Sequence, residues 1–276
     1  MVIALGAAAV VFGVYLFLIA PGRKRKAAWP SGMFDVPYAH RGLHGEGVPE
    51  NSLPAFAAAA AMGYGIEMDV HLTGDGCLVI HHDSSLKASC GADVIIEKTP
   101  LAQLRQYRLF GTEESIPTLE EALERIGGHT PLIVEMKTAG KRNGELARKT
   151  LEVLRGAGGL WCVESFDPRL MAFVRRHAPD VIRGQLAFDP WKGNWPQRGA
   201  KYFCGAHMLA NFLSRPDFIA YEYETDRNFT FRLIRTLFRP VTAAWTVRSK
   251  EAWLEQRNRY DLLIFEGFRP NRQRDQ

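Results

Sequence analysis

The segment GIEMDVHLTGDGCLVIHH, residues 65–82, decides the fold. Two apolar runs, 65–70 and 77–82, are separated only by the six residues HLTGDG, of which TGDG, residues 73–76, is the expected turn. Neighbouring parallel strands need a crossover of about a dozen residues or more, so these two runs cannot be consecutive parallel strands. A DG turn between extended runs instead predicts a hairpin. Centring the turn in the middle of TGDG places His82 opposite Glu67.

Outside this hairpin, short apolar runs alternate with amphipathic stretches from residue 36 onward, which is typical of βα units around a parallel sheet. Eight barrel strands are expected, at 36–40, 65–70, 132–137, 160–165, 181–186, 218–222, 241–246 and 262–266. Helices are expected at 53–62, 118–126, 145–154, 168–177, 229–238 and 250–256. Eight such units predict an α/β fold, a (β/α)8 TIM barrel with a β-hairpin excursion after strand 2.

Composition fits one large domain, because 46% of the 276 residues are hydrophobic and 24% are charged. The formal net charge of +5 favours anionic partners such as lipid headgroups or phosphates. Nucleic acid is not expected as a partner, since the basic residues are dispersed and form no recognition motif. The four cysteines show no CxxC spacing and are expected to be reduced.

The N-terminus is expected to be a transmembrane anchor. Residues 1–20 contain neither charge nor proline and have about the length of a membrane-spanning helix. The basic cluster Arg23, Lys24, Arg25 and Lys26 follows the apolar run, whereas a signal peptide carries its positive charge first. By the positive-inside rule, a single-pass protein of the cell membrane with a cytoplasmic catalytic domain is expected. A cleaved signal ending near Ala20 is the alternative.

The domain boundaries follow from these patterns. The anchor is expected at 1–22, a basic juxtamembrane linker at 23–35, the barrel at 36–270 and a tail at 271–276. The linker contains Trp29, Pro30 and Gly32, which suit an irregular segment.

Charged side chains follow the ends of the expected strands, where the chemistry of barrel enzymes gathers. The second strand carries Glu67 and Asp69, which alternation places on one face. Glu135 and Lys137 occupy the equivalent places two residues apart on the next strand. Three carboxylates with no cysteine nearby favour a hard cation, Mg²⁺ or Ca²⁺.

Two histidines stand where proton transfer is needed. His40 ends the first strand and His82 ends the hairpin, so both are expected at the same rim. They suit the two proton transfers of phosphodiester cleavage, and Arg41 and Lys137 add positive charge for a phosphate. His81 is expected to be a packing residue, because adjacent strand residues face opposite ways.

The motifs HRG, ENS, ExD, the DG turn, HHD, IPTLEEAL and ExK occur in this order, and in this pattern the chain resembles the glycerophosphodiester phosphodiesterase family. The resemblance implies His40 and His82 as the acid–base pair and Glu67, Asp69 and Glu135 as ligands of Ca²⁺ or Mg²⁺. It further implies phosphate contacts from Arg41 and Lys137, with Glu50 and Trp245 around the pocket.

The implied reaction is hydrolysis of glycerophosphodiesters, or of lysophospholipids, to glycerol 3-phosphate or lysophosphatidic acid and an alcohol. Attack by a substrate hydroxyl and attack by water both remain open. Two positions depart from the family pattern: Arg248 stands where asparagine is usual, and Glu266 where a Thr-Asp pair is common. The alternatives are a phospholipase D-like activity of the sphingomyelinase D type and an inactive barrel that binds headgroups at a membrane.

Overall fold

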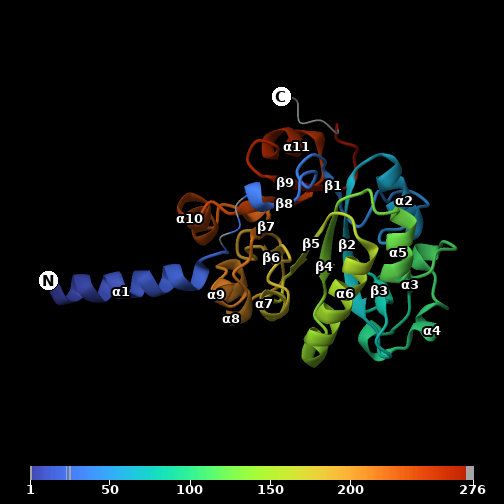
Figure 1. Ribbon diagram of the computed structural model, residues 1–276, viewed down its shortest axis with the longest axis horizontal. Coiled ribbons are helices and arrows are strands. Elements are labelled where there is room, and N and C mark those ends of the chain that lie inside the picture. The colour runs from blue at the N-terminus through green and yellow to red at the C-terminus, as the bar shows by residue number, and fades with distance from the viewer. Residues whose placement is uncertain (1, 23, 25, 272–276) are drawn as a thin grey trace.

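The architecture is a closed barrel with helices around it, in a computed structural model that describes residues 2–22, 24 and 26–271, with only the backbone for 2–4 (Figure 1). Arg23 and Arg25 of the basic cluster and residues 272–276 of the expected tail lie outside the described residues. The strands are β1 (Tyr38–Ala39), β2 (Gly65–Leu72), β3 (Leu78–Ile80), β4 (Leu132–Met136), β5 (Trp161–Ser165), β6 (Arg183–Ala187), β7 (Phe218–Glu222), β8 (Val241–Val247) and β9 (Leu262–Phe265).

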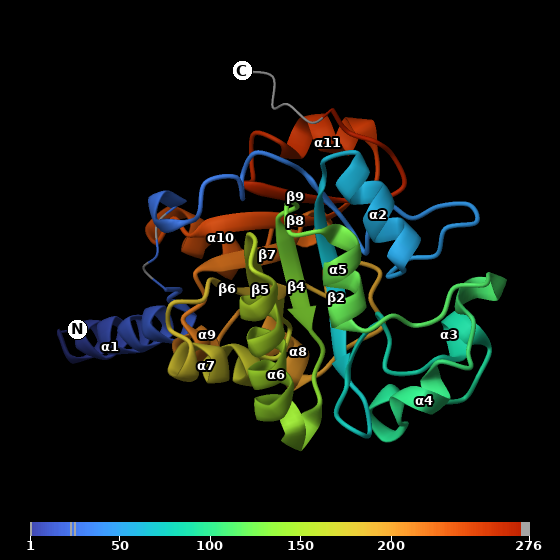
Figure 2. The ribbon, with the colours of Figure 1, turned by 45° about the vertical axis from the view of Figure 1, so that its right-hand side comes forward.

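Helices follow most strands and cover the outside of the barrel (Figure 2). They are α1 (Val2–Ile19), α2 (Leu53–Ala61), α3 (Lys87–Cys90), α4 (Leu101–Leu104), α5 (Leu119–Ile126), α6 (Asn143–Ala157), α7 (Pro168–His177), α8 (Ala200–Ala206), α9 (Asn211–Ser214), α10 (Phe229–Leu237) and α11 (Lys250–Gln256). Side-chain caps begin the predicted helices α2, α5, α7, α10 and α11, which satisfies backbone N–H groups that a helix start leaves free.

The sheet closes on itself. Its order is β1-β9-β8-β7-β6-β5-β4-β2-β3, and β1 also pairs with β2, so eight parallel strands form the predicted barrel. The ninth strand, β3, pairs antiparallel with β2 and is the predicted hairpin. The register differs by one residue from the prediction, because the turn closes between Thr73 and Cys77 and is centred on Asp75. Extension of this register places His82 opposite Met68.

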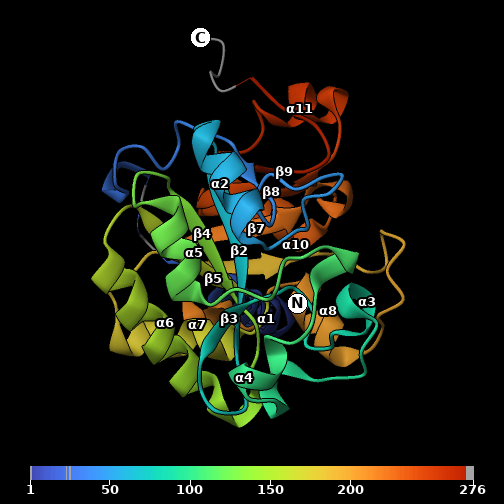
Figure 3. The same cartoon turned by 90° about the vertical axis from the view of Figure 1, so that its right-hand side faces the viewer.

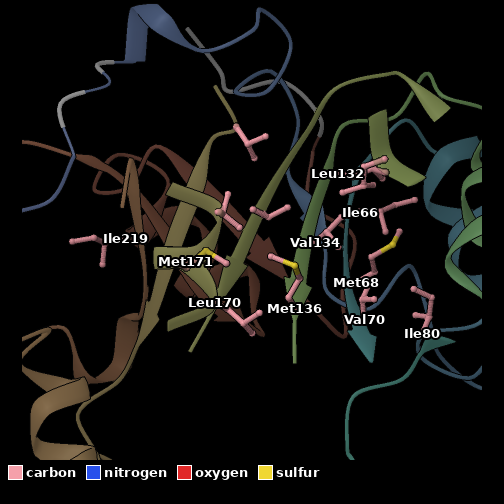
Figure 4. Packing of buried hydrophobic residues seen from close by; sticks show 14 of the residues in the cluster. Ile66, Met68, Val70, Ile80, Leu132, Val134, Met136, Leu170, Met171 and Ile219 are labelled. Atoms are coloured by element: carbon pink, nitrogen blue, oxygen red, sulfur yellow. The ribbon is translucent and has the colours of Figure 1, made fainter. Parts of the chain in front are cut away.

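Alternation of strand side chains creates two separate cores. Residues that point outward, including Ile66, Met68 and Val70 of β2, pack under the surrounding helices (Figure 4). Residues that point inward, including Tyr38 and Phe218, fill the barrel. Gly184 of β6 makes room for the Phe218 ring, since a Cβ there would lie 2.2 Å from it.

The segment expected as a linker closes the amino-terminal end of the barrel. Trp29 and Met33 are buried in the interior core, and the Trp29 ring lies 5.4 Å from that of Phe218. Lys24 donates to the carbonyl of Asp180 at 2.8 Å, and Lys26 pairs with Asp261 at 3.3 Å. The described part of this segment is therefore held against the domain.

An excursion between β3 and α5 has its own small core, which includes Leu86, Ile96 and Leu104. It contains α3 and α4 (Figure 3), and Val79 of β3 belongs to the same core. These helices were not predicted, because each has only four residues and shows no helical periodicity.

The expected transmembrane span is not found: within the described residues, no helix is long and apolar enough to cross a bilayer. Helix α1 has 18 described residues. Its carboxyl end is also held by the barrel domain. Ile19 is buried, and the side chain of Asn211 donates to its carbonyl at 2.9 Å. The rest of α1 extends away from the barrel (Figure 1), with the side chains of Val10, Val11 and Phe12 exposed.

We expect Trp29→Ala to lower the free energy of unfolding by about 3–5 kcal/mol, the usual cost of truncating a buried tryptophan. Trp29→Phe is the matched control, because Nε1 of Trp29 has no hydrogen-bond partner to lose in the part of the chain that the structure describes. Urea denaturation followed by circular dichroism measures both. An alanine variant as stable as the phenylalanine variant would show that Trp29 does not close the barrel.

Candidate active site

Three buried carboxylates lie together at the carboxyl-terminal end of β2 and β4. Asp69 and Glu135 are register partners on the two adjacent strands, and Glu67 is one inward-facing position below Asp69. Ligand oxygens of all three lie within 4.8 Å of one another. Lys137 bridges two of them, with its Nζ 2.8 Å from Asp69 and 2.7 Å from Glu135.

Burial and charge divide this cluster. Burial raises the pKa of Glu135 to about 7 against the opposing charge of Lys137. Burial and then the charge of Asp69 raise the pKa of Glu67 well above its usual range. Burial would also raise the pKa of Asp69, but Lys137, His82 and Arg41 outweigh it and lower that pKa. Asp69 is therefore the firmly ionised member, while burial favours the neutral form of the other two and a bound cation would favour their ionised form.

The loop after β1 reaches into this cluster from the side. The backbone N–H of Arg41 donates to Glu67 at 3.0 Å, and its guanidinium donates to Glu50 at 2.8 Å. The side chain of Asn51 donates to Asp69 at 2.7 Å. Arg41 and Asn51 both have positive φ, 54° and 53°, a conformation that non-glycine residues rarely adopt. The HRG and ENS motifs thus hold two of the carboxylates in place.

His40 is oriented by a carboxylate from the last strand segment. Its Nδ1 lies 2.9 Å from Glu266, which leaves Nε2 directed to the cluster, 4.0 Å from Glu67. Burial lowers the pKa of His40, and the hydrogen bond to Glu266 opposes that shift. The same bond lowers the pKa of Glu266 to about 2. Arg248 donates to the same oxygen of Glu266 at 3.2 Å, so the two departures from the family pattern contact each other.

His82 lies at the same rim. Its Nδ1 lies 2.8 Å from Asp83, and its charge interacts with Asp69, Lys137 and Arg41. Burial and the charge of Lys137 lower the pKa of His82 to about 4. His81 instead packs away from the rim: it is buried and hydrogen-bonded to the Asp83 carbonyl and the Ser89 hydroxyl.

A buried histidine on the hairpin, His71, supports the backbone of His82. Nε2 of His71 lies 3.2 Å from the His82 carbonyl, and its Nδ1 lies 2.6 Å from Glu97. Glu97 also accepts from Ser84 two residues beyond His82. His71 had no expected role, because its contact with Glu97 joins residues 26 apart in the chain.

Glu164 is a fourth carboxylate that the sequence analysis missed. It is the β5 register partner of Glu135 and is buried, and its Oε2 has no hydrogen-bond partner among the described residues. Burial and then the charge of Glu135 raise its pKa well above the usual range. The signal was present in the sequence, since Glu164 ends a predicted strand as Glu135 does.

Trp245 lies on the other side of the barrel mouth, among aromatic side chains. Its ring is 5.6 Å from Phe166 and 6.5 Å from Phe188. The strands β1, β2, β4 and β5 therefore place charged groups at the rim, whereas the β6–β8 side is aromatic. The structure brings together eight of the nine predicted site residues, His40, Arg41, Glu50, Glu67, Asp69, His82, Glu135 and Lys137, and places Trp245 opposite them.

Convergence of charged side chains at the carboxyl ends of parallel strands is the arrangement found in barrel enzymes. The model of the glycerophosphoryl diester phosphodiesterase family matches residues 40–262. The chain therefore belongs to this family of enzymes.

Individual relatives agree with that assignment. A glycerophosphodiester phosphodiesterase of Caldanaerobacter subterraneus is 30% identical over 167 residues, 55% of this chain and 68% of the relative. A lysophospholipase D of Rattus norvegicus is 31% identical over 130 residues, 42% of this chain and 40% of the relative. The structure of an Oleispira antarctica phosphodiesterase in complex with the product sn-glycerol-3-phosphate matches with a TM-score of 0.67 and 26% identity, covering 83% of this chain and 93% of that one.

We expect Glu266→Ala to lower kcat by about 10- to 100-fold, the usual cost of removing the partner that orients a functional histidine. Arg248→Ala is the matched control, since it removes only the exposed ion pair to Glu266, and such pairs contribute about 1 kcal/mol or less. Steady-state kinetics on a glycerophosphodiester measure both variants. Equal losses in the two variants would contradict an orienting role for Glu266.

Proposed function

We propose that the protein is a metal-dependent phosphodiesterase that hydrolyses glycerophosphodiesters to glycerol 3-phosphate and an alcohol. The observation that carries the proposal is the meeting, at one end of the barrel, of three carboxylates within 4.8 Å with two cationic side chains and two oriented imidazoles. Family membership supports the reaction class.

The carboxylates fit a divalent metal ion. Glu67, Asp69 and Glu135 would hold it, and their oxygen donors suit Ca²⁺ or Mg²⁺. Together with Glu50, they form a group of four carboxylates beside the cationic side chains of Arg41 and Lys137. A divalent ion would add positive charge for an anionic diester. When bound, such an ion polarises a phosphoryl oxygen and stabilises charge in the transition state.

The chain's own cations would bind the phosphate. Lys137 and Arg41 are both mostly buried and both tied to carboxylates, so their positions are fixed before substrate arrives. Preorganised positive charge is more effective than mobile charge, because it needs no reorganisation during the reaction.

His40 and His82 would exchange protons with the attacking and leaving oxygens. Each ring has a carboxylate at Nδ1, from Glu266 and Asp83 respectively. A carboxylate acceptor fixes a proton on Nδ1 of the neutral ring, so Nε2 is left as the base. Either a substrate hydroxyl or water can serve as the nucleophile in this arrangement.

We further propose that the protein acts at the cytoplasmic face of the cell membrane, which would give it access to lysophospholipids. Support comes from α1, which carries no charged residue and exposes more than half of the side-chain surface of Val10, Val11 and Phe12. Exposed apolar surface of this kind marks a membrane or protein contact.

We expect EDTA to abolish release of glycerol 3-phosphate from a glycerophosphodiester, and Ca²⁺ or Mg²⁺ to restore it, because a bound divalent ion would supply the charge that stabilises the transition state. Glu135→Gln should weaken metal binding measured by calorimetry. Glu120→Gln, on the exposed face of α5, is the control. Full activity after chelation would refute the metal-dependent proposal.

We expect His82→Ala to lower kcat by about 10²- to 10⁴-fold, the usual contribution of a general acid or base. His129→Ala changes an exposed histidine before β4 and should leave kcat unchanged. An active His82→Ala variant would rule out proton transfer by His82.

We expect Val10→Glu combined with Val11→Glu to reduce co-sedimentation of the protein with phosphatidylglycerol vesicles, because charge opposes insertion of an apolar surface. Activity on a soluble glycerophosphodiester should be retained. Equal sedimentation of the variant and the unmodified protein would contradict a role for α1 in membrane binding.

A further inference from the structure

The aromatic side of the barrel mouth contains a buried carboxylate. Glu222 ends β7 and is 7% exposed, and its register partner on β8 is Trp245. Both of its carboxylate oxygens accept from the indole N–H of Trp195, at 2.8 and 3.0 Å. Within the described part of the chain, Glu222 forms no ion pair.

Such a carboxylate is costly to bury without a positive partner. Burial raises the pKa of Glu222, and the charge of Arg248 opposes that shift, but the Arg248 guanidinium is directed to Glu266 at 3.2 Å. Glu224, two residues further, adds another negative charge on the same turn. This region of the mouth therefore attracts positive charge, in contrast to the side that holds Arg41 and Lys137.

The rings around Glu222 have the geometry that cation recognition uses. Phe166 and Trp245 are inclined at 85°, and Phe166 and Phe188 at 84°, so their faces form walls at right angles. Phe188 also packs against Trp195 at 4.7 Å. Phe166 is 40% exposed, so solvent reaches this group of rings. Aromatic faces combined with a carboxylate favour an alkylammonium ion, because the ring quadrupole and the charge act in the same direction.

We propose that Glu222, Trp195, Trp245, Phe166 and Phe188 form a subsite for the alkylammonium group of the diester's alcohol, which makes choline esters the preferred substrate class. The inference rests on the proposed function, because it places the substrate's alcohol in the same barrel mouth. The phosphate binds at the carboxylate and histidine side, and the cationic alcohol extends to the β6–β8 side.

The decisive comparison uses two substrates that differ in the charge of the alcohol, glycerophosphocholine and glycerophosphoglycerol. We expect the unmodified enzyme, loaded with Ca²⁺ or Mg²⁺, to prefer glycerophosphocholine in kcat/KM by about fivefold or more, from the usual strength of a cation–π contact. Glu222→Gln keeps the acceptor for Trp195 and removes the charge, so it should raise KM for the choline ester by a similar factor. Its kcat/KM for glycerophosphoglycerol should stay within about twofold of the original value, since no cation contact is lost. Glu120→Gln, an exposed carboxylate on α5 far from this group of rings in the sequence, is the control.

Direct binding separates this subsite from the reaction itself. Choline should quench tryptophan fluorescence more strongly than its neutral isostere 3,3-dimethylbutan-1-ol, and the difference should vanish in Glu222→Gln. If no diester is cleaved but this difference persists, the proposed function fails and the subsite stands. If both diesters are cleaved equally well, or Glu222→Gln affects both alike, the subsite is refuted and the function stands. With lysophospholipids as substrates, the KM of Glu222→Gln could instead depend on acyl-chain length and not on the charge of the alcohol. That result would assign the rings to a lipid chain and refute the subsite.

Discussion

Crowding of negative charge at one end of the barrel is the constraint on which the site depends. Glu67, Asp69 and Glu135 are forced together because they occupy inward positions on two paired parallel strands. Their mutual repulsion is partly offset by Lys137, which contacts two of them, and is relieved further only by protonation or a bound cation. The surrounding parts, from the strained Arg41 loop to the Asn51 amide, hold these acids in place. Because this cluster of carboxylates is unfavourable without a cation, the arrangement of the rim favours a metal-dependent reaction.

Orientation of the two imidazoles depends on contacts from different parts of the fold. Glu266, just after the last strand, holds His40, while Asp83 contacts the ring of His82. The buried His71, paired with Glu97, supports the backbone of His82. His40 and its partner Glu266 therefore reach one rim from opposite ends of the domain's sequence. Because the barrel closes through β1, which pairs with both β2 and β9, Glu266 is brought beside His40. Closure of the sheet is thus also a requirement of the chemistry.

The mouth of the barrel is divided into a charged side and an aromatic side. A phosphodiester has the same division, with an anionic phosphate between two organic substituents. The aromatic side offers an organic substituent a contact surface without fixed hydrogen bonds, formed by Phe166, Phe188 and Trp245. Glu222 then distinguishes this surface from a purely apolar one.

The sequence by itself determined the eight strands, the hairpin and eight residues of the charged rim, because strand periodicity and strand ends are local properties. Tertiary structure decided the one-residue shift of the hairpin, the contact of Glu266 with His40 and the place of Glu164. It also decided that residues 26–35, expected as part of a juxtamembrane linker, pack against the end of the barrel. In the same way, Asn211 holds the end of α1, which had been expected to span a membrane. These features join residues far apart in the chain, so no local pattern encodes them. Burial and charge at such contacts depend on which strands become neighbours, and the order of strands is decided only when the sheet closes.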